Sequence, residues 1–135
     1  SIAKNTIILP TSAYREEGTS YHYLPDSDEI EVDQLLLQKA KSVFDKTILT
    51  VVEGKIWTTD AVYRETYGKV KLMQDRGCIG VDMELSALLA LAKYRDVKFF
   101  QFLIGEDAVG GEVKPPLERN NQEIFNTAIS LLLNI

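Results

Sequence analysis

Cysteine and histidine are nearly absent from this 135-residue sequence, and long apolar runs are absent altogether. The single cysteine, Cys78, cannot form a disulfide within the chain, so nothing requires an oxidising compartment. One cysteine and one histidine do not make a zinc site of the usual ligand count. No apolar run approaches the roughly 20 residues that span a bilayer, and the N-terminus lacks a signal-peptide core. We therefore expect a cytoplasmic protein without a metal.

Positively charged residues are also few. The sequence has 15 lysines and arginines against 20 acidic residues, and a protein with the resulting net charge of -5 is repelled by nucleic acids and anionic membranes. Hydrophobic residues make up 45% and charged residues 26%, which is typical of a globular domain. No internal repeat or low-complexity linker divides the chain. The composition predicts one domain over residues 1–135, with neither a nucleic-acid nor a membrane partner.

Apolar patterning predicts alternating strands and helices, which indicate an α/β architecture. Pro10 ends the first apolar run, so residues 10–33 are expected to form a long loop. The Ala/Leu helix at 84–92 has no polar face, which predicts burial on more than one side. Strands are expected at residues 6–9, 47–52, 78–81 and 99–104, and helices at 33–44 (capped by Asp33), 70–74 (ended by Gly77), 84–92 and from 117 onward.

Acidic residues follow two of the expected strands. Asp82-Met83-Glu84 follows the strand at 78–81, and Glu106-Asp107 follows the strand at 99–104. Ligands of open α/β sheets bind at the carboxyl ends of strands, where a carboxylate suits two neighbouring hydroxyls and methionine a sugar face. Glu84 is equally well explained as a first-turn residue favoured by the helix dipole. Because one buried helix separates the two strand ends, we expect them to lie side by side.

Two other clusters carry weaker signals. The acidic residues between Asp26 and Asp33 do not fit a calcium loop, because Ile30 stands where an oxygen ligand is needed. A solvated loop explains these charges more simply. His22 lies between two tyrosines. It could serve as a general base, although we favour a loop histidine packed between aromatic rings.

The motif Gly80-Val81-Asp82-Met83-Glu84, followed by the Ala/Leu helix and a strand that ends in Asp107, resembles the nucleoside phosphorylase family. That family includes purine nucleoside and uridine phosphorylases, with methylthioadenosine nucleosidases as relatives. Residues 10–20, residues 57–66 and Glu118-Arg119 resemble further parts of its C-terminal half. The resemblance implies a three-layer α/β/α fold with a mixed central sheet, phosphorylase/hydrolase-like and truncated at the N-terminus.

The resemblance also implies a ribose and base site. Glu84 would bind the ribose 2′- and 3′-hydroxyls, with Met83 packed against the sugar. Tyr63 and Val62 would lie near the base. Val62 departs from the family pattern, because an aromatic residue that stacks on the base is common at that position.

The proton donor is implied by the same comparison. Asp107 would protonate the purine ring at N7, and Arg119 would position or polarise that acid. Glu106 stands where a small hydroxyl residue is frequent, and a neighbouring carboxylate would raise the pKa of Asp107. Uridine-type members lack this acid and carry a glutamine in the segment at 64–66, which here reads Arg-Glu-Thr. A purine nucleoside is therefore favoured.

By resemblance, the reaction is phosphorolysis of a nucleoside to free base and ribose 1-phosphate, with inorganic phosphate as co-substrate and no cofactor. The family builds homo-oligomers, and its phosphate-binding residues lie in an N-terminal half that this sequence lacks. Arg15, Arg64 and Arg119 are the arginines that could replace them. A uridine phosphorylase-related enzyme, a nucleosidase, a catalytically inactive truncated member and a fragment without function of its own remain alternatives.

Overall fold

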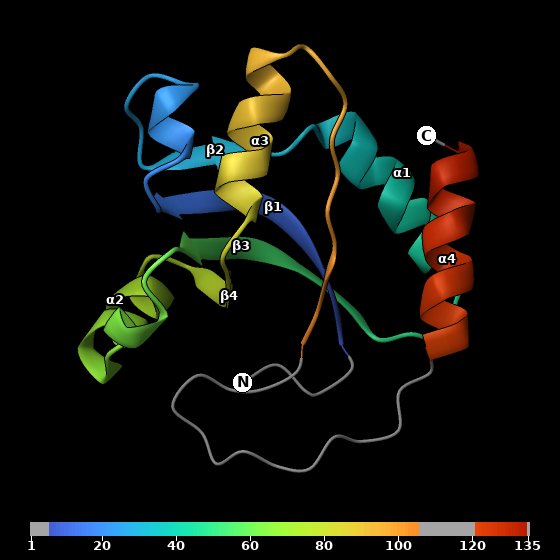
Figure 1. Cartoon of the computed structure of the whole chain (residues 1–135). Coiled ribbons are helices and arrows are strands. Elements are labelled where there is room, and N and C mark those ends of the chain that lie inside the picture. Colours follow the sequence, from blue (N-terminus) through green and yellow to red (C-terminus); the bar gives the residue numbers. More distant parts are fainter. Residues whose placement is uncertain (1–5, 106–120, 135) are drawn as a thin grey trace.

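The computed structural model describes residues 6–105 and 121–134 (Figure 1). Residues 106–120 lie outside the described residues. The roles expected for Asp107 and Arg119 therefore fall outside what the structure describes. Within the described ranges the strands are β1 (Ile7–Glu16), β2 (Glu29–Glu31), β3 (Val51–Thr59), β4 (Cys78–Asp82) and β5 (Leu103–Ile104). The helices are α1 (Gln34–Phe44), α2 (Tyr67–Asp75), α3 (Leu85–Tyr94) and α4 (Asn121–Asn134), and 3-10 turns occur at η1 (Ser20–His22) and η2 (Val62–Arg64).

The strands form one mixed sheet, which confirms the predicted fold class. The strand order is β2-β1-β3-β4, and β5 also pairs with β1. β1, β3 and β4 are parallel, whereas β2 and β5 run antiparallel to β1. The carboxyl ends of the three parallel strands therefore meet at one side of the sheet. We call this side the carboxyl edge; it comprises residues 15–20, 58–66 and 82–86.

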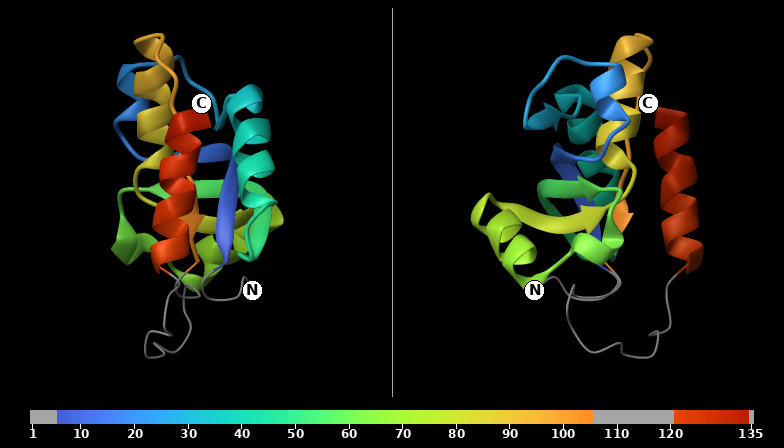
Figure 2. Two further views of the ribbon diagram at one scale, coloured as in Figure 1. Left: turned by 90° about the vertical axis from the view of Figure 1, so that its right-hand side faces the viewer. Right: turned by 60° about the vertical axis from the view of Figure 1, so that its left-hand side comes forward.

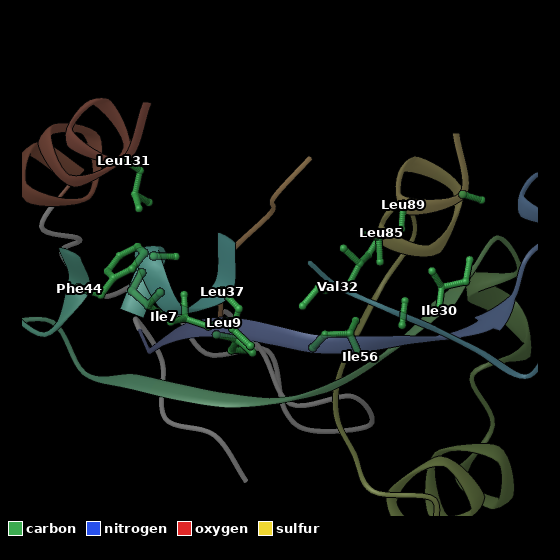
Figure 3. Packing of buried hydrophobic residues seen from close by; sticks show 14 of the residues in the cluster. Ile7, Leu9, Ile30, Val32, Leu37, Phe44, Ile56, Leu85, Leu89 and Leu131 are labelled. Carbon is green, nitrogen blue, oxygen red and sulfur yellow. The ribbon is translucent and has the colours of Figure 1, made fainter. Parts of the chain in front are cut away.

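Helices cover the sheet unequally. α1, α3 and α4 pack on one face, and α1 and α4 lie side by side (Figure 2). Their apolar side chains join those of the strands in the main core, which Figure 3 shows above β1. Because successive strand residues point to opposite faces, Ile56 enters this core while Trp57 packs with Met73 of α2 and Cys78 in a second, smaller cluster.

The first strand is longer than predicted. β1 runs through Pro10 to Glu16, so the expected loop at 10–33 contains most of β1, together with η1 and β2. Pro10 pairs with Gly54, and the register with β3 then shifts between Pro10 and Ala13. A proline at a sheet irregularity removes no ladder hydrogen bond that the sheet needs. The prediction was wrong because it treated proline as a strand end.

The second predicted strand was placed too early. Residues 47–50 lead into β3, which begins at Val51 and extends to Thr59. Two charged residues, Glu53 and Lys55, interrupt the apolar pattern of β3, so the pattern did not indicate its full length. Each forms an ion pair with a neighbouring element: Glu53 with Lys41 of α1, and Lys55 with Glu29 of β2.

The strand predicted at 99–104 is reduced to β5, and its direction overturns the expected arrangement of strand ends. β5 runs antiparallel to β1, and the amide of Gly105 donates to the Thr6 carbonyl at 2.8 Å. β5 therefore ends beside the beginning of β1, while β4 ends at the carboxyl edge. The two strand ends do not lie side by side, because only one of the two strands is parallel to β1.

Helix α3 also differs from expectation. Leu85 and Leu89 are buried, but Leu88 and Leu91 are 38% and 37% exposed, so the helix is buried on one side only. The prediction was wrong because an apolar sequence does not by itself supply a second packing partner. Among the described residues, no helix is long and apolar enough to cross a membrane.

Two predicted helix ends are confirmed. The Asp33 carboxylate accepts hydrogen bonds from the amides of Leu35 and Leu36 at 2.8 and 3.1 Å, which makes it the N-cap of α1. Gly77 follows α2 with a φ of +85°, a left-handed conformation that favours glycine. Local chemistry therefore sets both boundaries.

We expect Asp33→Ala to lower the free energy of unfolding by about 1 kcal/mol, because two amides of the first turn lose their acceptor. Urea denaturation followed by circular dichroism measures this. Asp26→Ala is the control, since it removes the same charge from an exposed bend. An equal loss in both variants would show an effect of net charge and not of the cap.

Candidate functional site

Side-chain hydrogen bonds tie the ends of the parallel strands together at the carboxyl edge. The amide of Gly18, after β1, donates to the Asp60 carboxylate, after β3, at 3.0 Å. The Thr58 hydroxyl of β3 donates to Asp82 of β4 at 2.7 Å. Side chains thus link neighbouring strand ends at the last register pair of β3 and β4 and beyond the last pair of β1 and β3.

Glu17 is the centre of the most buried part of this edge. It is 6% exposed, and its Oε2 accepts from the amides of Thr19 and Ser20 at 2.6 and 2.9 Å. Its Oε1 accepts from the Ser86 hydroxyl of α3 at 2.7 Å. Burial on its own raises the pKa of Glu17, but the hydrogen bonds from Ser20, Ser86 and Thr19 outweigh it and hold the pKa below 4.5. Glu17 therefore stays ionised near neutral pH.

Arg15 is buried beneath the same loop and serves it structurally. Its side chain is 3% exposed, and Nε donates to the Ser20 hydroxyl at 2.9 Å. Nη1 donates to the Pro25 carbonyl at 2.8 Å and to the Ser27 hydroxyl at 2.9 Å, while the guanidinium lies 4.0 Å from the centre of the Tyr21 ring. Arg15 is therefore not presented to a phosphate at the surface.

The two carboxylates of the Asp-Met-Glu motif have different surroundings. Asp82 accepts from the Thr58 hydroxyl at 2.7 Å, from the Leu85 amide at 2.8 Å and from Gln101 Nε2 at 3.1 Å. Glu84 is exposed, and its side chain makes no capping hydrogen bond to α3. Glu84 occupies the N-cap position of α3, where a negative charge is also favoured by the helix dipole, while Asp82 accepts the hydrogen bond from the first-turn amide of Leu85.

Between these fixed points the chain makes a short exposed turn. Asp82 is held on one side, and Leu85 and Ser86 are buried on the other. Met83 between them is 46% exposed, and its amide donates to the neighbouring Glu84 carboxylate at 3.3 Å. We call these two residues the Met83–Glu84 turn. It presents an exposed carboxylate and a half-exposed thioether between residues that are hydrogen-bonded or buried.

The residues predicted to lie near the base occupy η2, directly after β3. Val62 and Tyr63 are 50% and 99% exposed. β3 and β4 are parallel neighbours paired at Thr58 and Asp82, so η2 and the Met83–Glu84 turn both belong to the carboxyl edge. Burial raises the pKa of Glu65, which follows η2. Asp107 and Arg119 lie outside the described residues, so their distance from this edge is not defined.

A polar groove of about 540 Å³ lies elsewhere, between α1 and α4. It is lined by Lys39 and Lys46, among others, and it shares no residue with the carboxyl edge. Glu123 in its wall accepts from the Ile48 amide just before β3, which places the groove near the amino end of that strand. Within the described residues, no group of three or more histidine, cysteine or acidic side chains is placed to hold a metal.

Sequence reasoning missed Glu17, Ser86 and Thr58. A signal existed for Ser86, which is the one polar residue in the run Leu85–Ala92 and is fully buried. A lone hydroxyl in an apolar helix needs a partner, because burying it unpaired is unfavourable. Nothing in the sequence showed that this partner would be Glu17, 69 residues away.

The chain is similar to known proteins of one superfamily. The family profile of the phosphorylase superfamily matches residues 1–135. A DeoD-type purine nucleoside phosphorylase from Bacillus cereus is 35% identical over 100 residues, which are 73% of this chain and 42% of that protein. A Bacillus thuringiensis protein of the same name matches equally well. The chain spans less than half the length of the curated relatives it matches.

Solved structures share the fold at lower sequence identity. An AMP nucleosidase from Bacteroides thetaiotaomicron superimposes with a TM-score of 0.72 at 22% identity, and 97% of this chain covers 53% of that chain. The P. knowlesi homologue of P. falciparum PNP gives 0.73 at 18% identity, with coverage of 97% and 53%. A uridine phosphorylase from Vibrio fischeri gives 0.69 at 20% identity, with coverage of 97% and 51%. These likenesses establish the fold and that this chain corresponds to about half of it.

The two motif carboxylates should respond differently to neutralisation. We expect Asp82→Asn to lower the free energy of unfolding by about 1–3 kcal/mol, because an amide nitrogen then faces a hydrogen-bond donor. Glu84→Gln should stay within about 0.5 kcal/mol of the unmodified protein, since the side chain is exposed. Urea denaturation compares them. Equal losses would contradict the assignment of Asp82 as structural and Glu84 as free.

Glu17 should contribute stability that depends on pH. Because its pKa is lower in the folded protein than the ordinary 4.5, its contribution is complete above about pH 4.5 and is lost as the pH falls through the folded pKa. The stability difference between the unmodified protein and Glu17→Gln should therefore shrink below pH 4.5. Urea denaturation at pH 7, 5, 4 and 3 measures it. A difference that grew on acidification would contradict the lowered pKa.

Proposed function

Because this chain belongs to the phosphorylase superfamily, we propose that its carboxyl edge forms the ribose and base side of a nucleoside phosphorylase site. The proposed reaction transfers the pentosyl group of a purine nucleoside to inorganic phosphate, and no cofactor takes part. A phosphate oxygen attacks C1′, the bond from C1′ to the base nitrogen breaks, and its electron pair passes to the base, which is protonated. The activity is a proposal, since the chain spans about half of its relatives.

The observation that carries the proposal is the Met83–Glu84 turn. Glu84 presents a carboxylate whose oxygens can accept from two adjacent hydroxyls, as on a ribose. Met83 beside it offers an apolar surface for the sugar face. The turn follows β4 at the edge where open α/β sheets bind ligands. A purine nucleoside would thus be held by its diol at β4, with its base toward Val62 and Tyr63 after β3.

Protonation of the base is assigned by resemblance alone. Asp107 would donate to N7 of the purine, and Arg119 would position that acid. We assign phosphate to none of the described residues, because Arg15 is buried and its Nε and Nη1 already donate to the loop after β1. The second candidate is a nucleosidase, in which water replaces phosphate at C1′; the solved structures of similar fold include an AMP nucleosidase.

The two methionines allow a direct binding test. Met73 is 2% exposed and Met83 is 46% exposed, so labelling with [methyl-¹³C]methionine gives one buried and one surface signal. We expect inosine to shift the Met83 methyl signal and leave that of Met73 in place. 2′,3′-Dideoxyinosine should cause no shift, because it lacks the diol that Glu84 would bind.

Variants make this test specific. Glu84→Gln should weaken inosine binding about tenfold, which corresponds to a loss of about 1.4 kcal/mol. Glu31→Gln, which neutralises an exposed carboxylate of β2, should leave the titration unchanged. An inosine-induced shift that survives Glu84→Gln, or that dideoxyinosine reproduces, would refute the ribose assignment.

Turnover separates the remaining alternatives. Release of base from inosine, adenosine and uridine is measured with and without phosphate. Phosphate-dependent release from the purine nucleosides is expected; release without phosphate would support the nucleosidase, and binding without release a non-catalytic member. Asp107→Asn should abolish release while the Met83 shift remains. Loss of both together would show that Asp107 is needed for binding and not only as an acid.

A further inference from the structure

The start of α3 is anchored from two directions by one serine. The Ser86 amide donates to the Thr58 hydroxyl of β3 at 3.2 Å, and the Ser86 hydroxyl donates to Glu17 after β1 at 2.7 Å. Ser86 and Thr58 are both fully buried. The first turn of α3 is therefore fixed relative to two strands, and the Met83–Glu84 turn directly precedes it.

The bond between Glu17 and Ser86 is the stronger kind of hydrogen bond. An ionised carboxylate accepts but does not donate, and a hydroxyl bound to a charged acceptor in a buried place forms a charge-assisted bond. The other oxygen of Glu17 is occupied by the amides of Thr19 and Ser20. Glu17 therefore cannot turn away from Ser86 without unpairing its own loop.

This bond is not needed to form the helix itself. Asp82 already caps α3 through the Leu85 amide, and the apolar face of α3 packs in the main core. The bond between Glu17 and Ser86 instead fixes the position of α3 relative to the loop after β1, because it joins the two segments. The residues whose position depends most directly on it are Met83 and Glu84, which are exposed and have few contacts of their own.

We propose that Glu17 is a positioning residue for the nucleoside site: through the Ser86 hydroxyl it sets where the Met83–Glu84 turn stands. The inference rests on the proposed function, because it names a further residue on which ribose recognition depends. Glu17 touches no substrate itself. It holds the backbone of the Met83–Glu84 turn in place before a ligand binds. Less conformational entropy is then lost when the Glu84 and Met83 side chains contact the ligand.

The chain supplies a matched control for this bond. Ser12 of β1 is also buried, at 7% exposed, and its hydroxyl also donates to a glutamate, Glu29 of β2, at 3.2 Å. Ser12→Ala and Ser86→Ala therefore remove the same kind of side-chain bond from two places in one sheet. Only Ser86 is adjacent to the Met83–Glu84 turn.

The experiment uses the methionine methyl signals and inosine titrations described above. In ligand-free protein, Ser86→Ala should shift and broaden the Met83 signal and leave the Met73 signal unchanged, because Met73 lies in the second cluster. It should weaken inosine binding about tenfold, whereas Ser12→Ala should stay within about twofold and leave Met83 unchanged. Equal weakening by both serine variants, or an unmoved Met83 signal in Ser86→Ala, would overturn the proposal.

A second, more conservative variant tests the same bond in case Ser86→Ala fails to fold. Glu17→Gln keeps the side-chain shape and an oxygen for the two loop amides, and it replaces the charge-assisted bond to Ser86 by a weaker neutral one in which the amide nitrogen donates to the hydroxyl. It should therefore move the Met83 signal in the same direction as Ser86→Ala, by a smaller amount. The double variant should bind inosine no more weakly than the worse single variant, because both changes act on the same bond. Additive losses would show that Glu17 acts by another route.

The two proposals fail in different ways. If inosine shifts neither methyl signal of the unmodified protein, the nucleoside assignment fails, while the ligand-free Met83 signal of the variants still decides whether Glu17 positions the turn. If inosine binds and Ser86→Ala behaves like Ser12→Ala, the assignment stands and the positioning role fails.

Discussion

The need to satisfy the hydrogen bonds of a buried carboxylate organises the carboxyl edge of this molecule. An ionised Glu17 away from water is unfavourable unless several donors surround it, and the donors come from its own loop and from α3. The loop after β1 must therefore fold back on itself, and α3 must begin beside it. Because the Ser86 amide also reaches Thr58, the end of β3 is held in the same network. One charge thus brings together segments that are 69 residues apart in the chain.

The Asp-Met-Glu motif divides its two carboxylates between structure and surface. Asp82 accepts hydrogen bonds from Thr58, from the Leu85 amide and from Gln101, so it fixes the end of β4 relative to the start of α3. Glu84, two residues later, is exposed, and among the described residues its carboxylate accepts a hydrogen bond from the Met83 amide alone. Two acids that look alike in sequence therefore have opposite uses, since one is saturated by the protein and the other remains open to a ligand.

Local chemistry made part of this structure predictable, and long-range pairing made the rest unpredictable. Asp33 and Gly77 mark their helix ends because the signal lies within a few residues. The extension of β1 beyond Pro10 depends on a register irregularity against β3, and the reversal of β5 depends on its pairing with β1. The Met83–Glu84 turn was found through a motif, whereas its support by Glu17 depends on a contact that no local pattern reports.

The charges of the carboxyl edge suit the proposed sugar contact better than a contact with phosphate. Carboxylates suit hydroxyl donors, and the edge presents Glu84 outward while the guanidinium of Arg15 is turned inward to carbonyls and to Tyr21. Of the arginines considered for phosphate, Arg64 remains exposed on η2, where water and salt screen a single cation. Holding a doubly charged anion opposite the leaving base requires several donors in fixed positions. Among the described residues, Glu84 is therefore the group we propose for the sugar hydroxyls, and none is proposed for phosphate.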